Sequence, residues 1–236
     1  FDPAIGKLVQ TWEFDDAANT HDAPPSKNTL AALTKSRPSI NDLTLSPPFV
    51  STSNRQVQLD FGGMAKGYAV DIAINILKQE GISSGIINAG GDLKAIGSKN
   101  RSPWRIGIRH PRTSGAIAAV LANSEDAIFT SGDYERYYEK DGKRQHHILD
   151  PRTGKPVART VSVTVIHDNA TLADAAATAL FVAGPERWKE IAIKMGVDRV
   201  MLIDDKLNIW ITAKMQQQTQ LLDPSSVIHL TSMTKK

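Results

Sequence analysis

The chain has 236 residues, of which 41% are hydrophobic and 22% charged, a composition typical of a folded protein with one large or two small domains. Its net charge is only +3 and it contains no basic block, which argues against nucleic-acid binding. It has no cysteine, which excludes disulfides, thiolate catalysis and cysteine zinc sites, and no apolar run approaches the roughly 20 residues of a membrane span.

The N-terminal quarter is expected to contain a surface excursion. Residues Asp15–Arg55 are rich in Pro, Ser, Thr and Asn around one short helical pattern at Thr29–Ser36. Next, Gln56–Phe61 alternates like a strand, and Met64–Glu80 has a helical period. The apolar positions of that period are Ala65, Tyr68, Ile72, Ile76 and Leu77. We therefore predict a strand-to-helix junction at Gly62–Gly63.

This junction is a candidate phosphate site. Free backbone N–H groups and the positive end of the helix dipole attract anions there. Lys66 lies in the first turn, where a cation opposes the dipole at a cost of up to about 1 kcal/mol, and a bound polyanion would reverse that cost. On this segment alone, it is equally possible that Gly62 and Gly63 simply let the chain turn and that Lys66 points into solvent.

A second glycine pair lies in the run NAGGDL, residues Asn88–Leu93. It follows the apolar strand Gly85–Ile87 and precedes a short strand that ends near Gly97. Taken alone, a glycine-rich bend between strands is the better interpretation. Asp92 is nevertheless an acid beside a backbone that a ligand can approach closely.

The rest of the chain alternates between strands and helices. Strands are predicted at Trp104–Ile108, Ala116–Leu121, Ala127–Thr130, Thr160–Ile166, Arg199–Ile203 and Leu207–Ile211, and helices at Ala170–Val182 and Pro185–Met195. Without a repeat or an obvious linker, this order predicts an α+β fold with mixed, largely antiparallel sheets in one domain, residues 1–212. Residues 213–236 are expected to form a tail.

The segment Phe129–Pro156 combines acids, bases, a hydroxyl and two histidines. Asp150–Gly154 fits a type I turn with Pro151 at its second position and a glycine bulge behind it. The turn does not explain His147, three residues earlier. An imidazole can accept a proton near neutral pH, so His147 is a candidate base, although a lone histidine is more often structural.

The alanine-rich helix Ala170–Gly184 is apolar on nearly every face and should be buried. Asp174 and Thr178 stand four residues apart, hence on one face, and a buried carboxylate needs a charge partner or a metal. Such hard oxygen ligands suit Mg²⁺ rather than zinc. The competing interpretation is a capping box, with Thr171 as N-cap and Asp174 three residues later, and it is favoured when this segment is taken alone.

Seven segments, taken in order, resemble the ApbE family of flavin transferases, the FAD:protein FMN transferases. They are FDPAIGKLVQTWEF at the start, LDFGGMAKGYAVD, INAGGDL, TSGDYERYY, HHILDPRTGKP, SVTV from Ser162 and ADAAATALFVAG. Each is weak by itself, but their order over Phe1–Ile211 is specific. The resemblance implies an ApbE-like, T-fold-related architecture and an enzyme that moves FMN from FAD to a Thr or Ser hydroxyl of an acceptor flavoprotein, releasing AMP. Subunits of membrane redox pumps are acceptors of this kind.

The resemblance also implies a metal site and a base. The metal would be Mg²⁺, held by the side chains of Asp174 and Thr178 and by the backbone carbonyl of Gly63. His147 corresponds to the family's histidine in the HI-x-DP run, which would take the proton of the acceptor hydroxyl because an alcohol is a poor nucleophile at neutral pH. His146 is the less favoured of the two histidines.

A set of flavin-binding residues follows from the same resemblance. Asp60 and Lys66 match positions that contact FAD, and Ile148 matches a position beside the catalytic histidine, where it would act through its backbone. Gly91 of the second glycine pair and Asp92, the residue after it, complete the predicted set.

In one respect the chain departs from the family pattern. Phe1 corresponds to a point well inside the usual mature protein, so we expect the signal sequence and one wall of the flavin-ring pocket to be missing. The family's usual location is the bacterial periplasm, often on a lipid anchor. Two other functions stay open. One is a Mg²⁺-dependent FAD pyrophosphatase, in which the same metal site would direct water and yield FMN and AMP. The other, suggested by the missing wall, is a non-catalytic FAD-binding protein.

Overall fold

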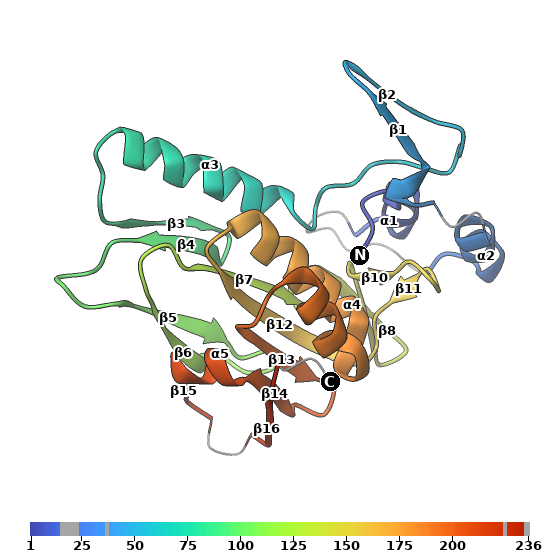
Figure 1. The fold of residues 1–236 in the computed structure, drawn as a ribbon. Helices are drawn as coiled ribbons and strands as arrows, with labels where there is room; N and C mark the ends of the chain where they lie inside the picture. Colours follow the sequence, from blue (N-terminus) through green and yellow to red (C-terminus); the bar gives the residue numbers. More distant parts are fainter. Residues whose placement is uncertain (15–23, 36–37, 224–225, 234–236) are drawn as a thin grey trace. The chain divides into compact units, whose positions relative to one another are not determined.

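The computed structural model describes residues 1–14, 24–35, 38–223 and 226–233. They form an α+β fold of mixed, mostly antiparallel sheets and helices, as predicted (Figure 1). The chain divides into two compact units: Phe1–Gly63 with Asp133–Val157, and Met64–Gly132 with Ala158–Lys236. Among the described residues, no helix is both long and apolar enough to cross a bilayer.

The first unit contains short helices and three hairpins. Its elements are α1 (Gly6–Trp12), α2 (Lys27–Lys35), a 3₁₀ turn (Ile40–Asp42), β1 (Leu43–Ser46), β2 (Phe49–Thr52), β8 (Tyr137–Lys140), β9 (Lys143–His146), β10 (Leu149–Asp150) and β11 (Lys155–Pro156). Its core is formed by Ile5, Leu8, Trp12, Leu30, Tyr138 and Leu149. Helix α2 agrees with the helical pattern expected in the surface excursion. Residues 15–23 and 36–37 of that excursion lie outside the described residues.

Two local predictions in this unit had opposite outcomes. The turn at Asp150–Gly154 is confirmed, since the amides of Thr153 and Gly154 both donate to the Asp150 carbonyl, at 3.1 and 2.8 Å. The strand at Gln56–Phe61 is wrong: Gln58 forms only an isolated bridge with Ile5. The alternating side chains do not separate into a buried and an exposed face, because Leu59 is 41% exposed.

The second unit is built on a seven-stranded sheet in the order β16-β14-β13-β12-β7-β4-β3. Its strands are β3 (Gly85–Ala89), β4 (Asp92–Ile96), β7 (Ala127–Gly132), β12 (Thr160–His167), β13 (Val200–Asp204), β14 (Ile209–Thr212) and β16 (Ile228–Thr231). A smaller sheet contains β5 (Trp104–Arg109), β6 (Ala116–Ala122) and β15 (Thr219–Leu221). Only the β14–β16 pair of these two sheets is parallel.

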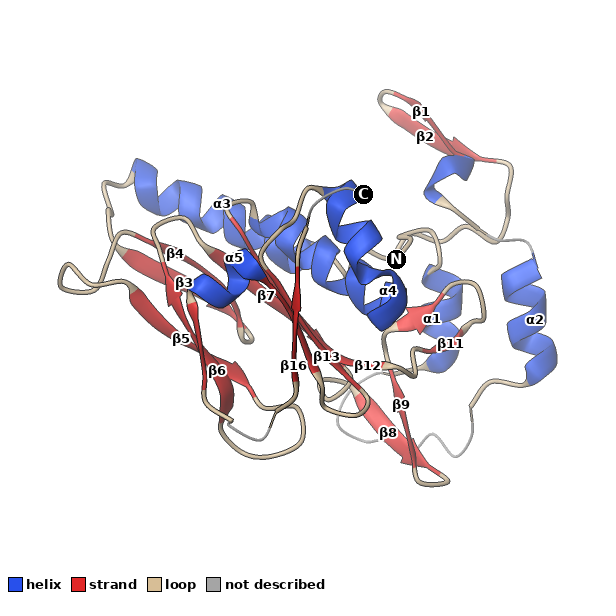
Figure 2. Ribbon diagram, turned by 60° about the horizontal axis from the view of Figure 1, so that its bottom comes forward, coloured by secondary structure: helices blue, strands red, loops and turns tan. Residues whose placement is uncertain are grey.

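Two helices pack on the large sheet: α3 (Ala65–Gln79) contacts β3 and β4, and α4 (Ala170–Met195) contacts β7 and β12 (Figure 2). The predicted break between two helices is confirmed inside α4, where Gly184 has a non-helical φ of 73° and Pro185 follows it. Proline suits the first turn of the second helical segment because its missing N–H needs no partner there.

The segment after Thr212, which we expected to be a tail, is built into the second unit. It forms α5 (Ala213–Gln217), and then β15 pairs with β6 and β16 with β14. The Thr212 hydroxyl caps α5 by accepting the Met215 amide, and Met215 is fully buried. Elements of three to five residues carry too little periodicity to be recognised in sequence.

The apolar period that predicted α3 does not form its buried face. Tyr68, Ile72 and Ile76 are 61%, 43% and 51% exposed. The buried residues are instead Gly67, Val70 and Ile74. A Cβ at Gly67 would lie 2.3 Å from the carbonyl oxygen of Ala170, so this glycine sets the crossing with α4. The closest approach of the two helices is therefore backbone against backbone.

Replacing Gly67 with alanine should lower the free energy of unfolding by about 1–3 kcal/mol, because the added methyl meets backbone that cannot rotate away. Gly85→Ala is the matched control, since no heavy atom lies within 4 Å of its added Cβ. That control should stay within about 0.5 kcal/mol of the parent protein. Urea unfolding of both variants measures the difference, and equal midpoints would contradict the close approach.

Candidate active site

Lys66 and Asp92 form an ion pair in the second unit, between the first turn of α3 and the first residue of β4. Lys66 Nζ donates to Asp92 Oδ2, while Asp92 Oδ1 accepts the amide of Thr130 at 2.7 Å. The Asp92 side chain is 5% exposed and that of Lys66 is 50% exposed. Burial raises the pKa of Asp92, and the Lys66 charge opposes this rise. A buried acid thus holds a cation that still reaches solvent.

The second glycine pair forms the turn between β3 and β4. Gly90 and Gly91 have φ of 68° and 105°, and Ala89 pairs with Asp92 across the turn. Positive φ at both central residues is typical of the tight hairpin turns that match strand twist. The bend expected from sequence is therefore confirmed. The Gly91 amide donates to Asn88 Oδ1 at 2.8 Å, and its role in flavin binding stays a prediction.

Asp174 and Thr178 extend from one face of α4 in the same unit. Asp174 is 5% exposed, and among the described residues its one hydrogen bond comes from the amide of Gly67 to Oδ2, at 2.9 Å. Burial raises the pKa of Asp174, and the nearby charge of Asp92 raises it further. The Thr178 hydroxyl hydrogen-bonds Ser131 Oγ at 3.1 Å. The acid is therefore poorly compensated and close to Lys66 and Asp92.

The capping-box interpretation of this helix is wrong. The N-cap of α4 is Asn169, whose side chain accepts the Leu172 amide at 2.7 Å. Thr171 is already the second helical residue, and Asp174 accepts an amide from α3 rather than from its own helix. Because Gly67 is the third residue of α3, Asp174 occupies one of the N–H groups at the junction that we considered as a phosphate site.

Asp60 and Gly63 lie in the first unit, at the end of its N-terminal segment. Asp60 Oδ1 accepts the amide of Gly62 at 2.7 Å, and the Asp60 amide donates to the Pro3 carbonyl at 2.7 Å. The predicted metal set, Gly63 with Asp174 and Thr178, therefore draws residues from both units and stays a prediction.

The two histidines of the first unit have different surroundings. His146 is 2% exposed; its Nε2 donates to the Val157 carbonyl at 2.7 Å, and its Nδ1 accepts the Ile148 amide at 3.3 Å. His147 is half-buried, and both its amide and its Nδ1 donate to the Arg136 carbonyl, at 3.1 and 3.3 Å. His146 thus has both ring nitrogens bound within the unit, which suits a structural residue.

Ile148 is buried, and both of its backbone polar groups have partners in the first unit. Its amide donates to His146, and its carbonyl accepts the Val157 amide at 3.1 Å. A carbonyl can accept two hydrogen bonds, so one acceptor position is left for the predicted contact with flavin.

Two polar residues at the end of β7, Thr130 and Ser131, were not among the predicted site residues. The Thr130 amide binds Asp92, and the Ser131 hydroxyl binds Thr178. The run TSGD, which begins at Thr130, is the sequence feature that could have pointed to these two residues. In the part of the chain that is described, no three His, Asp or Glu side chains gather closely enough to hold a metal. The predicted set contains only one carboxylate, so Mg²⁺ stays a prediction.

Known proteins resemble this chain over most of its length. The sequence model of the ApbE family matches residues 1–201. The FAD:protein FMN transferase of Rhodobacter capsulatus is 43% identical over 223 residues, covering 94% of this chain and 42% of that protein. The FAD:protein FMN transferase of Escherichia coli K12 is 34% identical over 224 residues, covering 89% and 62%. The chain thus spans less than two thirds of the length of these curated relatives.

Solved structures give the same result. The ApbE protein of Thermotoga maritima has a TM-score of 0.83 and 34% identity, covering 92% of this chain and 71% of that one. The flavin transferase ApbE of Vibrio cholerae has a TM-score of 0.78 and 31% identity, covering 92% and 70%. With a family match over residues 1–201 and the same fold at this level of identity, this chain belongs to the ApbE family.

Proposed function

We propose that this chain catalyses the Mg²⁺-dependent transfer of FMN from FAD to a Thr or Ser hydroxyl of an acceptor flavoprotein, with release of AMP. The observation that carries the proposal is the group of Lys66, Asp92 and Asp174, two buried acids and a half-exposed cation, in a member of this family. Relatives up to 43% identical are named FAD:protein FMN transferases.

The reaction exchanges the phosphoanhydride bond of FAD for a phosphate ester bond to the acceptor. The acceptor oxygen forms a bond to the phosphorus of the FMN half, and the bond from that phosphorus to the bridging oxygen breaks. AMP leaves with the bridging oxygen and its electron pair. Negative charge therefore grows on the departing phosphate, and catalysis depends mainly on positioning and on cations placed near that charge. Lys66, at the positive end of α3, is one such cation.

The residues of the second unit fit a hard divalent cation. Asp174 supplies a buried carboxylate with a single amide partner among the described residues, and Thr178 supplies a hydroxyl one helical turn away. With the carbonyl of Gly63, these three oxygens would hold Mg²⁺ and leave positions for water and phosphate oxygens. When bound, Mg²⁺ would neutralise charge on the phosphates.

His147 is the base that we assign to the acceptor hydroxyl. A carbonyl oxygen can only accept, so the contact with Arg136 puts the proton of a neutral His147 on Nδ1. In that tautomer Nε2 carries the lone pair that takes the hydroxyl proton. The contact between Nδ1 and the Arg136 carbonyl orients the ring for this role.

The intact mass of an acceptor domain tests the proposal. The domain carries one flavinylation threonine and is incubated with this protein, FAD and Mg²⁺, with an EDTA control and a Thr→Val acceptor control. We expect a Mg²⁺-dependent gain of one FMN unit in the threonine-bearing domain alone. Free FMN and AMP without a mass gain would instead indicate the pyrophosphatase, and untouched FAD would indicate a binding protein.

The location that we propose is the periplasm, with a lipid anchor on the full-length protein and subunits of membrane redox pumps as acceptors. The support is the family's usual location. Fractionation of cells that produce the full-length protein tests it, and recovery with a cytoplasmic marker enzyme would contradict it.

A further inference from the structure

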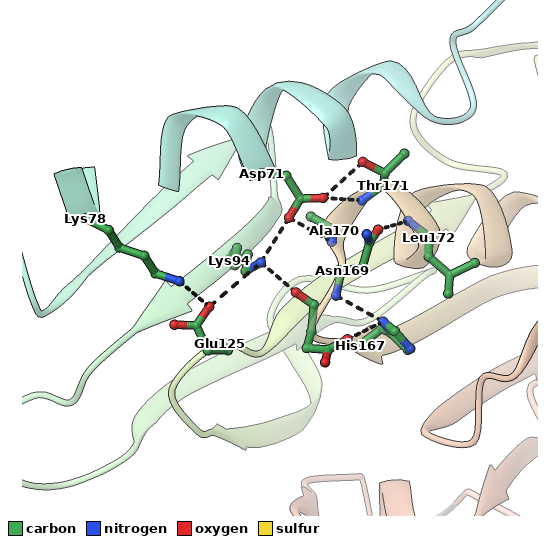
Figure 3. Close-up of polar contacts among 10 residues, drawn as sticks. Asp71, Lys78, Lys94, Glu125, His167, Asn169, Ala170, Thr171 and Leu172 are labelled. Atoms are coloured by element: carbon green, nitrogen blue, oxygen red, sulfur yellow. Dashed lines mark hydrogen bonds and ion pairs between the residues drawn. The ribbon is translucent and has the colours of Figure 1, made fainter. Parts of the chain in front are cut away.

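Asp71, on the second turn of α3, accepts hydrogen bonds from the first turn of α4 (Figure 3). Its Oδ1 accepts the Ala170 amide at 3.1 Å, and its Oδ2 accepts the amide and the hydroxyl of Thr171 at 2.9 and 3.0 Å. The first amides of a helix have no partner within the helix. Asp71 satisfies two of them in α4, and Asn169 satisfies the third.

Helices α3 and α4 each accept hydrogen bonds from N-terminal amides of the other. Helix α3 has no side-chain cap of its own, and the amide of its third residue, Gly67, donates to Asp174 of α4. Each helix thus places one carboxylate on the N-terminal amides of the other. The two contacts involve the residues of the close approach itself, since one donor is the Gly67 amide and another is the Ala170 amide. The hydrogen bond from Gly67 to Asp174 therefore depends on this crossing.

The surroundings of Asp71 keep its carboxylate charged. Burial alone would raise the pKa of Asp71, but hydrogen bonds from Thr171, Lys94 and Ala170 outweigh it and lower the pKa. Lys94 is 7% exposed and donates to Asp71 Oδ1 at 2.9 Å and to the Asp168 carbonyl at 2.6 Å. A carboxylate oxygen of Glu125 lies 4.0 Å from Lys94 Nζ. Glu125 also accepts a hydrogen bond from Lys78. A protonated or neutral substitute for Asp71 would lack an acceptor for at least one of these donors.

We propose that Asp71 is a positioning residue for flavin transfer, which holds the first turn of α4 against α3 so that Asp174 stays beside Lys66 and Asp92. In this proposal Asp71 acts through the α3–α4 crossing and not by binding FAD or metal itself. The expected effect on catalysis rests on the proposed function. The expected effect on structure is protection of the Gly67 amide, and it does not depend on that function.

Three variants test the positioning role. Asp71→Ala removes every hydrogen bond that the Asp71 carboxylate accepts. Asp71→Asn replaces one carboxylate oxygen with an NH₂ group, which then faces a hydrogen-bond donor. Thr171→Val removes only the hydrogen bond from the Thr171 hydroxyl. Two matched controls are Asn169→Ala, which removes the other cap of α4, and Glu125→Gln, which alters the same network without touching α4. The variants Asp71→Asn and Thr171→Val keep the test decisive if Asp71→Ala does not fold.

Two measurements are compared across the series. Residue-resolved hydrogen exchange reports protection of the Gly67 amide. Quenching of FAD fluorescence, measured with Mg²⁺ and with EDTA, reports how much Mg²⁺ raises the affinity for FAD, which we call the Mg²⁺ gain. For Asp71→Ala we expect loss of Gly67 protection and a ten- to hundredfold smaller Mg²⁺ gain, the size of effect typical of residues that orient metal ligands. Asp71→Asn and then Thr171→Val should follow with smaller losses.

Both controls should keep Gly67 protection and the Mg²⁺ gain, even where Asn169→Ala melts as early as Asp71→Asn. Equal losses in Asn169→Ala and Asp71→Asn at matched melting temperature would overturn the proposal, because Asp71 would then act through stability alone. Unchanged protection in Asp71→Asn would overturn it as well. If the parent protein shows no Mg²⁺ gain, the proposed function fails, and the Gly67 amide still decides whether Asp71 positions α4.

Discussion

Asp174→Ala should reduce Mg²⁺-dependent FMN transfer by about a thousandfold or more. The variant loses the one carboxylate of the predicted metal set, and a bound cation contributes several kcal/mol to stabilising developing charge. Each 1.4 kcal/mol or so corresponds to a factor of ten in rate. Transfer rates at saturating FAD and acceptor, measured across a Mg²⁺ titration, give the size of the loss.

The same substitution should change stability far less. It removes one hydrogen bond, from the Gly67 amide, but it also removes a buried acid whose pKa is raised because burial disfavours its charge. These effects oppose each other, so we expect a change in the free energy of unfolding of about 1 kcal/mol or less. Asp174→Asn is the control, since it keeps an acceptor for Gly67 and loses only the charge.

Both Asp174 variants should therefore be inactive and folded. A variant that unfolds early but, below its melting temperature, transfers FMN at the parental rate would show that Asp174 serves the helix crossing and not the chemistry. A loss of activity that high Mg²⁺ restores in Asp174→Asn but not in Asp174→Ala would place the remaining amide oxygen of the asparagine on the metal.

Local sequence patterns were sufficient to predict features that depend on a single helix or turn. The i, i+4 spacing placed Asp174 and Thr178 on one face of α4, and the turn residues at Asp150–Gly154 determined their own hydrogen bonds. The break at Gly184 was equally local, because a glycine with positive φ followed by proline ends a helical segment wherever it occurs.

Contacts between distant segments decided what the sequence left open. Thr171 and Asp174 have capping-box spacing, yet the helix begins earlier, with Asn169 as its N-cap. The Thr171 amide that Asp174 would accept donates instead to Asp71, about a hundred residues away in the chain. No local pattern contains that information. For the same reason the buried face of α3 was not predictable: it is determined by the close approach of Gly67 to α4, not by the apolar period.

His147→Ala should slow transfer by about a hundred- to ten-thousandfold and leave FAD affinity within about twofold. A positioned base contributes a factor of this size, whereas the imidazole is assigned no part in holding the flavin. Single-turnover transfer rates and FAD fluorescence quenching separate the two quantities. His147→Gln is a useful companion, because it keeps a polar side chain but has no basic nitrogen.

His146→Ala is the matched control, since it removes the neighbouring imidazole but should act on stability. His146 is buried and binds both Val157 and Ile148, so its loss leaves two backbone groups without their partner, at a cost of about 1–3 kcal/mol each. We expect this variant to melt earlier and, while folded, to transfer FMN at near the parental rate. Equal losses of transfer rate and FAD affinity in His147→Ala would make that histidine a flavin ligand rather than a base. A loss of chemistry in His146→Ala alone would reverse the roles that the hydrogen bonds of the two rings assign to them.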